Sequence, residues 1–372
     1  MKRVILSVTN DLVTDLRLDK TATLLTNEGY SVLTVGRCYR HSPPLSPRTY
    51  QTKRLHLLFK KGFLFYAEYN LRLFFFLLFQ KVDILTANDL DTLLPNFLVS
   101  KIRRKKILYD SHEYFCGLPE LTGRPFVRSV WQSIEKFCFP RLPVVTTVSQ
   151  SIATLYDKLY PNRKMKVQVI RNVPTKKDLA ITETRTSLNL PVDKKIVIMQ
   201  GSINVDRGAE ELIQAMLQVE NAVLLIIGDG DVIPELKQLV RSLKLEEKVI
   251  FIPRLTPDKL FNYTVLSDIG CSLEKDSNLN YRYCLPNKLF DYLLAQLPVI
   301  ISDLPEMRNI VETYEVGLIL GEYSPVAIAN AITKLIEDEE LYLFYKNNTA
   351  KMTTLFNWEK ESQLLRQLYA DL

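Results

Sequence analysis

Short apolar runs alternate with helix-length segments along the whole chain, and this alternation most constrains how the chain can fold. In the first half the runs lie at residues 4–8, 31–35, 83–87, 106–109 and 144–148. In the second half they lie at 195–199, 223–227, 249–252, 269–273, 299–301 and 317–320. Buried parallel strands have this apolar character, and the segments between them are long enough for crossover helices. The pattern predicts an α/β protein with two doubly wound, mostly parallel sheets.

The length of the chain also favours two domains. A chain of 372 residues is long for a single core, and its 47% hydrophobic content is enough to fill two. A polar stretch at 174–190 lacks sustained apolar periodicity, so we expect domains at 1–178 and 179–355, followed by a terminal segment at 356–372. Ligands of such folds bind beyond the carboxyl ends of the strands, which predicts a site in a cleft between two facing domains.

The cysteines and the N-terminus indicate the compartment. Five cysteines are widely spaced without a Cys-x-x-Cys pair, which favours neither a zinc site nor a disulfide framework. The apolar run at 4–8 is short and no small-residue cleavage site follows it, so it resembles a first strand more than an export signal. We expect a cytoplasmic protein with reduced thiols.

The charge of the chain is unevenly distributed. Residues 1–175 contain 27 Lys and Arg against 13 Asp and Glu, a net +14, whereas residues 176–372 contain 21 against 29, a net −8. A basic half indicates contact with an anionic surface or acceptor, although dispersed, solvated side chains would have the same composition. No nucleic-acid-binding module is recognisable, so we expect no nucleic-acid partner.

The segment 53–81 interleaves basic and aromatic residues. Such a segment can lie on a bilayer with its rings among the headgroups, which predicts peripheral association with the inner face of a membrane. Packing of this segment against its own sheet is the alternative. The apolar run at 73–79 is far shorter than the roughly 20 residues of a spanning helix, so we do not expect a span. The cations are Lys53, Arg54, Lys60, Lys61 and Arg72.

The stretch 281–302 places polar residues at the start of an apolar helix that leads into a buried strand. Pro286 suits the first helical position, and Lys288 adds a positive charge beside the free amides of the first turn, where an anion can bind. Asp291, one turn later, could accept hydrogen bonds from the hydroxyls of a ribose. A phosphate site beside a ribose site predicts a sugar nucleotide. The alternative is a solvated Asp291 or a surface pair with Lys288.

Two strand-end loops add candidate groups. Gly201 turns the chain after the strand at 195–199, and Arg207 lies just before a helix expected at 209–218, where a guanidinium could bind a diphosphate. The alternative is a charged surface turn. His112 follows the strand at 106–109, where an imidazole could contact a sugar hydroxyl or shuttle a proton.

Two common cofactor patterns are missing. The Gly228-Asp-Gly230 turn lacks the third glycine of a dinucleotide fingerprint, so we expect no nicotinamide. The spacing of Asp89 and Asp91 is read as coincidental, and we expect no metal.

The order of these motifs resembles the group-1 (family 4, GT4-like) glycosyltransferases of the GT-B fold. The resemblance covers nearly the whole chain and implies a retaining, metal-independent, cofactor-free transfer from a UDP- or GDP-linked sugar. The implied acceptor is a glycan or a lipid-linked glycan, in surface polysaccharide biosynthesis. The motifs are Asp110-Ser-His-Glu113, Val148-Ser149, Arg171-Asn-Val-Pro174, Gln200-Gly201 to Arg207-Gly208, Gly228-Asp-Gly230, Pro286-Asn-Lys to Asp291, and Leu297-Pro-Val-Ile300.

The resemblance also implies roles for the domains and for particular residues. The first domain would bind the acceptor and the second the donor, and a last helix at 358–369 would cross back to the first domain. His112, Arg207 and Lys288 would be catalytic, and Asp291 would hold the ribose. The donor-binding candidates are Gly201, Ser202, Arg207, Tyr283, Leu285, Pro286, Asn287, Lys288 and Asp291. The acceptor-side candidates are Asn10, Asp15, Arg17, Asp89, Asp91 and Glu113.

The chain departs from the family pattern at three places. Tyr283 replaces a common first glutamate, Ser202 stands where an arginine often follows the strand glycine, and the loop at 9–17 is not glycine-rich. Two rival functions therefore stay open. One is another GT-B nucleotide-sugar enzyme such as an epimerase, and the other is a catalytically silent GT-B binding subunit.

Overall fold

The computed structural model describes residues 1–372 except 14, 164–165 and 176–182. The chain divides into two compact units. Unit 1 comprises Met1–Asn172 with Glu361–Leu372, and unit 2 comprises Val173–Lys360. The boundary expected between residues 178 and 179 lies outside the described residues.

Unit 1 is built on a seven-stranded sheet with the strand order β3-β2-β1-β4-β5-β6-β7, in which every pairing is parallel. The strands are β1 (Arg3–Asp11), β2 (Ser31–Cys38), β3 (Gln51–His56), β4 (Ile84–Asn88), β5 (Lys106–Ser111), β6 (Val144–Thr147) and β7 (Gln168–Val169). The helices are α1 (Leu16–Asn27), α2 (Gly62–Phe79), α3 (Leu90–Ile102), α4 (Pro125–Cys138) and α5 (Gln150–Leu159), with 3-10 turns at Phe115–Gly117, Pro119–Leu121 and Phe139–Arg141.

Two strands of unit 1 were not predicted. β3 is an edge strand that pairs only with β2, and five of its six residues are polar, so the sequence offers no apolar run to mark it. Lys53 and Arg54 therefore belong to this strand and not to the helix that follows. β7 is only two residues long, which is too short for a recognisable pattern.

Unit 2 contains a six-stranded parallel sheet with the order β10-β9-β8-β11-β12-β13. The strands are β8 (Lys195–Ser202), β9 (Ala222–Asp229), β10 (Val249–Ile252), β11 (Ile269–Ser272), β12 (Val299–Ile301) and β13 (Gly317–Ile319). The helices are α6 (Ala209–Ala215), α7 (Ile233–Ser242), α8 (Pro257–Val265), α9 (Leu279–Arg282), α10 (Asn287–Leu294), α11 (Pro305–Tyr314), α12 (Pro325–Glu337) and α13 (Glu339–Leu355).

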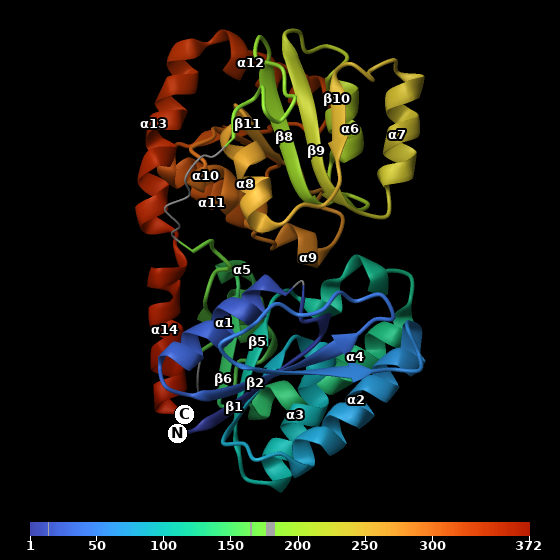
Figure 1. The fold of residues 1–372 in the computed structure, drawn as a ribbon, viewed down its shortest axis with the longest axis vertical. Coiled ribbons are helices and arrows are strands. Elements are labelled where there is room, and N and C mark those ends of the chain that lie inside the picture. The colour runs from blue at the N-terminus through green and yellow to red at the C-terminus, as the bar shows by residue number, and fades with distance from the viewer. Residues whose placement is uncertain (14, 164–165, 176–182) are drawn as a thin grey trace. The chain divides into compact units, whose positions relative to one another are not determined.

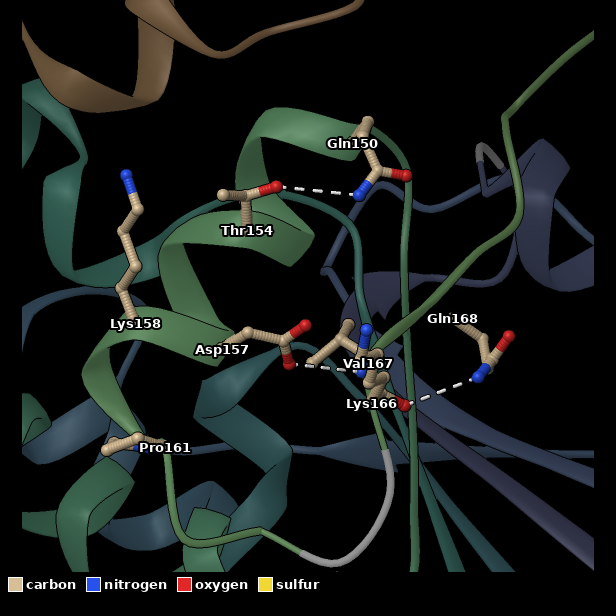
Figure 2. A pocket seen from close by; sticks show the side chains of 8 residues that line it. All are labelled: Gln150, Thr154, Asp157, Lys158, Pro161, Lys166, Val167 and Gln168. Carbon is tan, nitrogen blue, oxygen red and sulfur yellow. Dashed lines mark hydrogen bonds between the residues drawn. The ribbon is translucent and has the colours of Figure 1, made fainter.

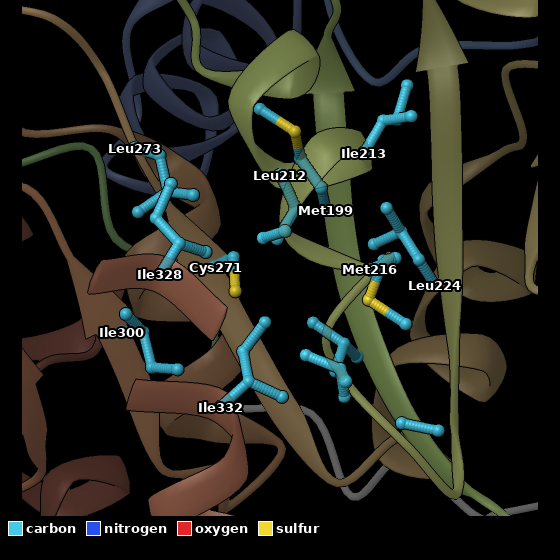
Figure 3. Close-up of a cluster of buried hydrophobic side chains, with 14 of the residues drawn as sticks. Met199, Leu212, Ile213, Met216, Leu224, Cys271, Leu273, Ile300, Ile328 and Ile332 are labelled. Atoms are coloured by element: carbon cyan, nitrogen blue, oxygen red, sulfur yellow. The ribbon is translucent and has the colours of Figure 1, made fainter. Parts of the chain in front are cut away.

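Both faces of the unit 2 sheet are covered by helices. Along β8, Val197 and Met199 face a core that includes residues of α6 and α12, and Figure 3 shows part of this core. Ile196 and Ile198 face the opposite core, which includes α10 and α11. Alternate residues of one strand thus enter two cores, which explains the continuous apolar runs. The predicted doubly wound α/β architecture is confirmed.

The strand order also indicates where ligands bind. It reverses direction between β1 and β4 in unit 1 and between β8 and β11 in unit 2. In doubly wound sheets, loops leaving the carboxyl ends of two such neighbouring strands separate and leave a crevice at this switch point. The segments after β8 and β11, and those after β1 and β4, are therefore the places to look for functional side chains.

Helix α2 is longer than the seven-residue apolar run indicated. It contains 18 residues, because Glu68 and Arg72 pair one turn apart on its surface, with Oε1 and Nε 2.8 Å apart, and do not interrupt it. In the described part of the chain it is the one helix long and apolar enough to cross a membrane by length and composition. One stripe of α2, at residues 65, 69, 73 and 77, packs beside α3 in a core of unit 1 (Figure 1).

Helix α14 (Trp358–Asp371) ends the chain, and its residues from Glu361 onward belong to unit 1. The hydroxyl groups of Tyr369 and Thr86 lie 2.7 Å apart, and Arg171 Nη1 lies 3.0 Å from Glu361 Oε1. Both ends of the chain consequently lie near each other in unit 1 (Figure 1). These contacts join the last helix to the sheet of unit 1.

Candidate functional site

The segment after β8 makes a close approach to the end of β11. Gly201 and Ser202 are exposed at the end of β8, and Arg207 follows six residues after Gly201. Gly208 precedes α6 with a left-handed backbone, at a φ of 84°. A Cβ on Gly208 would lie 2.3 Å from the carbonyl oxygen of Leu273, so only glycine allows this approach. Arg207 is thereby brought beside the segment that follows β11.

A buried carboxylate, Glu274, lies where these segments meet. Its side chain is fully buried, and its Oε1 is 3.3 Å from Arg207 Nη1 and 2.8 Å from Lys288 Nζ. Its Oε2 accepts a hydrogen bond of 2.8 Å from the hydroxyl of Ser272. Burial raises the pKa of Glu274, but Lys288 and Arg207 outweigh burial and lower it to about 2. Glu274 is therefore ionised and joins the two predicted phosphate-binding cations.

Glu274 was not among the predicted site residues. The signal was weak, because a single acidic residue after a short strand usually lies on the surface. Its position directly after a buried strand of a parallel sheet, in the same place as the other candidate groups, could have identified it.

Arg207 is held from a second side by an aromatic ring. Its guanidinium carbon lies 4.8 Å from the ring centre of Tyr281, and the Tyr281 hydroxyl donates to the carbonyl of Val205. Arg207 Nε is buried without a hydrogen-bond partner. The predicted cation is thus fixed in orientation and keeps an unused donor.

Helix α10 carries the other predicted donor contacts. Pro286 caps the helix and Asn287 begins it, one residue later than predicted. Asn287 is exposed, but Lys288 is 93% buried, because its side chain turns inward to Glu274. Asp291 accepts a hydrogen bond of 3.0 Å from Gln200 Nε2, which places it at the carboxyl end of β8.

The remaining donor candidates divide into two kinds. Tyr283 is half-buried at the end of α9. Leu285 is buried among the side chains of the core between the sheet and α10. The side chain of Leu285 therefore serves packing, and its donor contact stays a prediction.

In unit 1, His112 lies between two carboxylates. Its Nδ1 is 3.3 Å from Asp89 Oδ2, and its Nε2 is 3.1 Å from Asp110 Oδ2. Its backbone amide donates to Asp89 Oδ1 over 2.7 Å. Burial lowers the pKa of His112, but the two carboxylates outweigh burial and raise it to about 9. With both ring nitrogens facing carboxylates, the geometry favours the imidazolium form of His112, and the proton shuttle stays a prediction.

Asp89 has an unusual backbone. Its φ of 60° and ψ of 165° lie in a region that is normally occupied by glycine. Backbone strain of this kind is typical of functional sites and persists only where the surroundings hold it in place. The contacts to His112 are part of that support.

Arg17 forms a buried pair with Asp110. Nε and Nη2 donate to the two carboxylate oxygens over 2.9 and 2.8 Å, and Nη1 donates to the carbonyl of Ile170 over 3.1 Å. Both residues are buried. The geometry therefore indicates that Arg17 stabilises unit 1, whereas the sequence predicted a contact with the acceptor.

The other acceptor-side candidates lie at the carboxyl ends of β1, β4 and β5. Asp15 caps α1 by accepting from the amide of Leu18, and exposed Asn10 donates to Asp15 over 3.4 Å. Asp91 is buried and accepts from the hydroxyl of Thr9, and burial raises the pKa of Asp91 to about 7. The last candidate, Glu113, is half-buried just after β5. These residues lie around the switch point of the unit 1 sheet.

A hollow of about 670 Å³ is lined by residues of α5, by Pro161 and by residues 166–168. Figure 2 shows these side chains. None of the predicted site residues lines it. Within the described ranges, no group of three or more His, Cys, Asp or Glu side chains is arranged to hold a metal ion. The residues that line the hollow are Gln150, Thr154, Asp157, Lys158, Pro161, Lys166, Val167 and Gln168.

Comparison with known proteins finds a family model that matches part of unit 2. The family model described as glycosyl transferases group 1 matches residues 180–352. An uncharacterised glycosyltransferase of Methanocaldococcus jannaschii is 24% identical over 228 residues, which cover 58% of this chain and 56% of the relative. The N-acetyl-alpha-D-glucosaminyl L-malate synthase of Bacillus anthracis is 22% identical over 219 residues, covering 56% and 54%. The matches thus span about half the length of these curated relatives.

Solved structures match over the whole chain. Sucrose-phosphate synthase from Thermosynechococcus elongatus has a TM-score of 0.78 at 18% identity, with both chains fully covered. Anabaena HepE in complex with UDP and glucose also has a TM-score of 0.78, at 16% identity and with full coverage of both chains. Residues 180–352 are thus similar to the group 1 glycosyl transferases, and the two α/β units have the GT-B fold of the solved structures.

Proposed function

We propose that this chain transfers a sugar from a UDP- or GDP-linked donor to a glycan or lipid-linked acceptor. The observation that carries the proposal is the meeting of Arg207 and Lys288 at one carboxylate, close to the carboxyl ends of β8 and β11. Asp291 lies at the end of the same strand β8. This is the switch point of the unit that matches the family model, and it offers two cations and a carboxylate for a diphosphate and a ribose.

The chemistry follows from the charges of this site. As the bond between the sugar and the diphosphate lengthens, negative charge develops on the leaving oxygens. Arg207 and Lys288 would stabilise that charge without a metal ion, since both are already fixed before a ligand binds. We propose that the transfer retains the configuration of the donor sugar, as the family resemblance implies.

Unit 1 is the proposed acceptor domain. Its candidate groups lie around the switch point of its own sheet, and His112 would contribute a fixed positive charge. A solved structure similar to this chain, WaaG, is described as a glycosyltransferase involved in lipopolysaccharide biosynthesis, with a TM-score of 0.74 at 12% identity. That likeness supports the fold, and an acceptor in surface polysaccharide assembly is our proposal.

We also propose that the protein is cytoplasmic and binds the inner face of the membrane through α2. Phe63, Leu71, Phe75 and Phe79 are between 50% and 80% exposed and lie opposite the stripe that packs in the core of unit 1. Exposed lysines at 60, 61 and 81 flank the two ends of this helix. Exposed rings beside cations suit an anionic lipid surface on which the helix lies flat.

Donor turnover by the purified protein tests the proposed function. UDP-glucose and GDP-mannose are incubated with the native protein, Arg207→Met and Arg241→Met, with water as the acceptor of the sugar, and the release of UDP or GDP is measured. Arg241 is an exposed arginine on α7 and serves as the matched control. We expect nucleotide release by the native chain and by Arg241→Met, and a loss of at least tenfold in Arg207→Met. Binding without release would favour the silent subunit, and conversion of the donor sugar without release would favour an epimerase.

A further inference from the structure

We propose that Glu274 is a positioning residue for the nucleoside diphosphate. It holds Arg207 and Lys288 together as one preformed phosphate-binding unit. The inference rests on the proposed function, since it names the residue that organises the donor site.

The geometry shows why one carboxylate controls both cations. Both contacts are made to the same oxygen, Oε1, at 3.3 Å from Arg207 and 2.8 Å from Lys288. The second oxygen is fixed by the hydroxyl of Ser272. The three charged groups come from three segments, after β8, after β11 and in α10. Any rotation of Glu274 would therefore move both cations.

The charges of Arg207, Lys288 and Glu274 explain how the group would bind a diphosphate. Two cations at one buried point repel each other, and an unpaired buried charge is strongly destabilising. The carboxylate offsets one of the two positive charges and leaves the group with a net charge of +1. An anionic ligand then meets cations that are already in place, so binding requires little rearrangement.

A similar ion pair at the other end of the same sheet provides a control. Asp268 precedes β11 and lies 2.7 Å from Arg185 Nη2 and 3.7 Å from Lys195 Nζ. It therefore also has two cationic partners, but it lies at the amino ends of β8 and β11. Loss of this carboxylate should affect stability without affecting the donor site.

The experiment measures the Kd of UDP and of GDP by titration calorimetry, together with the melting temperature of each protein. The variants are Glu274→Gln, Lys288→Met, the double variant and Asp268→Asn. We expect Glu274→Gln and Lys288→Met each to weaken the preferred nucleotide at least tenfold, and Asp268→Asn to leave its Kd within twofold. We expect the loss of affinity in the double variant to be smaller than the sum of the two single losses, because Glu274 acts partly through Lys288 and partly through Arg207.

The double variant separates positioning from stability. Removing both partners of a buried pair is far less costly than removing one, so its melting temperature should rise above that of Glu274→Gln while its affinity stays low. An unchanged or tighter Kd in Glu274→Gln would overturn the inference, as would fully additive losses in the double variant. If Glu274→Gln does not fold, the double variant is compared with Lys288→Met alone, and a Kd equal to that of Lys288→Met overturns the inference, because Glu274 should still position Arg207. If the native chain binds neither UDP nor GDP, the proposed function itself fails.

Discussion

Replacing Arg17 with methionine should cost unit 1 a large part of its stability. The substitution removes two bonds to Asp110 and one to the carbonyl of Ile170, and it leaves a buried carboxylate. Asp110 keeps the hydroxyl of Thr146 and His112 as partners, which limits the loss. Breaking a buried ion pair by removing one partner costs about 3–5 kcal/mol. At roughly 2–4 °C per kcal/mol for a unit of this size, the melting temperature should fall by about 6–20 °C.

The assay follows unit 1 separately from unit 2. The chain has two tryptophans, Trp131 in unit 1 and Trp358 in unit 2, so a Trp358→Phe background confines the fluorescence to unit 1. Urea unfolding in that background gives the free energy with and without Arg17→Met. The matched control is Arg366→Met. It breaks a surface pair with Glu28, in which each side chain is 42% exposed, and it should cost at most about 1 kcal/mol. If Arg17→Met lowers the free energy of unfolding of unit 1 by less than about 1 kcal/mol, the structural role of this pair is refuted. Arg17 would then again be a candidate for binding the acceptor.

Three further outcomes are expected. The pKa of His112 is raised to about 9 in the folded protein, so its stabilising effect is fully present below its unfolded pKa of about 6.5 and is lost as the pH rises through 9. This loss amounts to about 3 kcal/mol at most, and a free energy of unfolding of unit 1 that does not fall between pH 6.5 and 9.5 would contradict it. Phe75→Asp should reduce sedimentation of the protein with vesicles of anionic lipid. Phe344→Asp changes an exposed position on α13 of unit 2 and should not reduce it. Equal effects of the two substitutions would argue against membrane binding through α2. Gly208→Ala should destabilise unit 2 by more than the roughly 1–2 kcal/mol that a left-handed backbone alone costs, because its Cβ would collide with Leu273. Gly29→Ala in unit 1 has the same φ of 84° in open space and should show only the backbone cost, so equal thermal-unfolding losses would refute the close approach.

Much of the fold could be predicted because buried parallel strands leave a continuous apolar signature. Every apolar run that was predicted to be a strand corresponds to a strand, with ends shifted by a few residues. Edge strand β3 could not be predicted in this way. It pairs with only one strand and most of its side chains are exposed, so its sequence need not be apolar. The apolar run at 73–79 marked only part of α2, since the helix also contains Glu68 and Arg72, which pair with each other.

The candidate site was only partly predictable. Arg207, Lys288 and Asp291 were recognisable because each lies in a local pattern at a strand or helix end. Glu274 has no local pattern, and its importance comes from two cations that are distant in the sequence. The burial of Arg17 could not be predicted for the same reason. Its partner Asp110 lies 93 residues away in the sequence, and the two residues form a buried pair only in the folded unit. Long-range pairing of charges leaves no periodic trace in a sequence.

The most direct test of a donor site in unit 2 is the thermal shift of the purified protein with UDP, GDP, ADP and CMP. The native chain is compared with Asp291→Ala and with Asp303→Ala, an exposed acid of the same unit that pairs with Arg308. A ligand at 100 times its Kd adds about 2.7 kcal/mol of stability. The account predicts a base-selective shift that Asp291→Ala abolishes and Asp303→Ala retains. No shift with any nucleotide, or a shift that Asp291→Ala leaves unchanged, would contradict it.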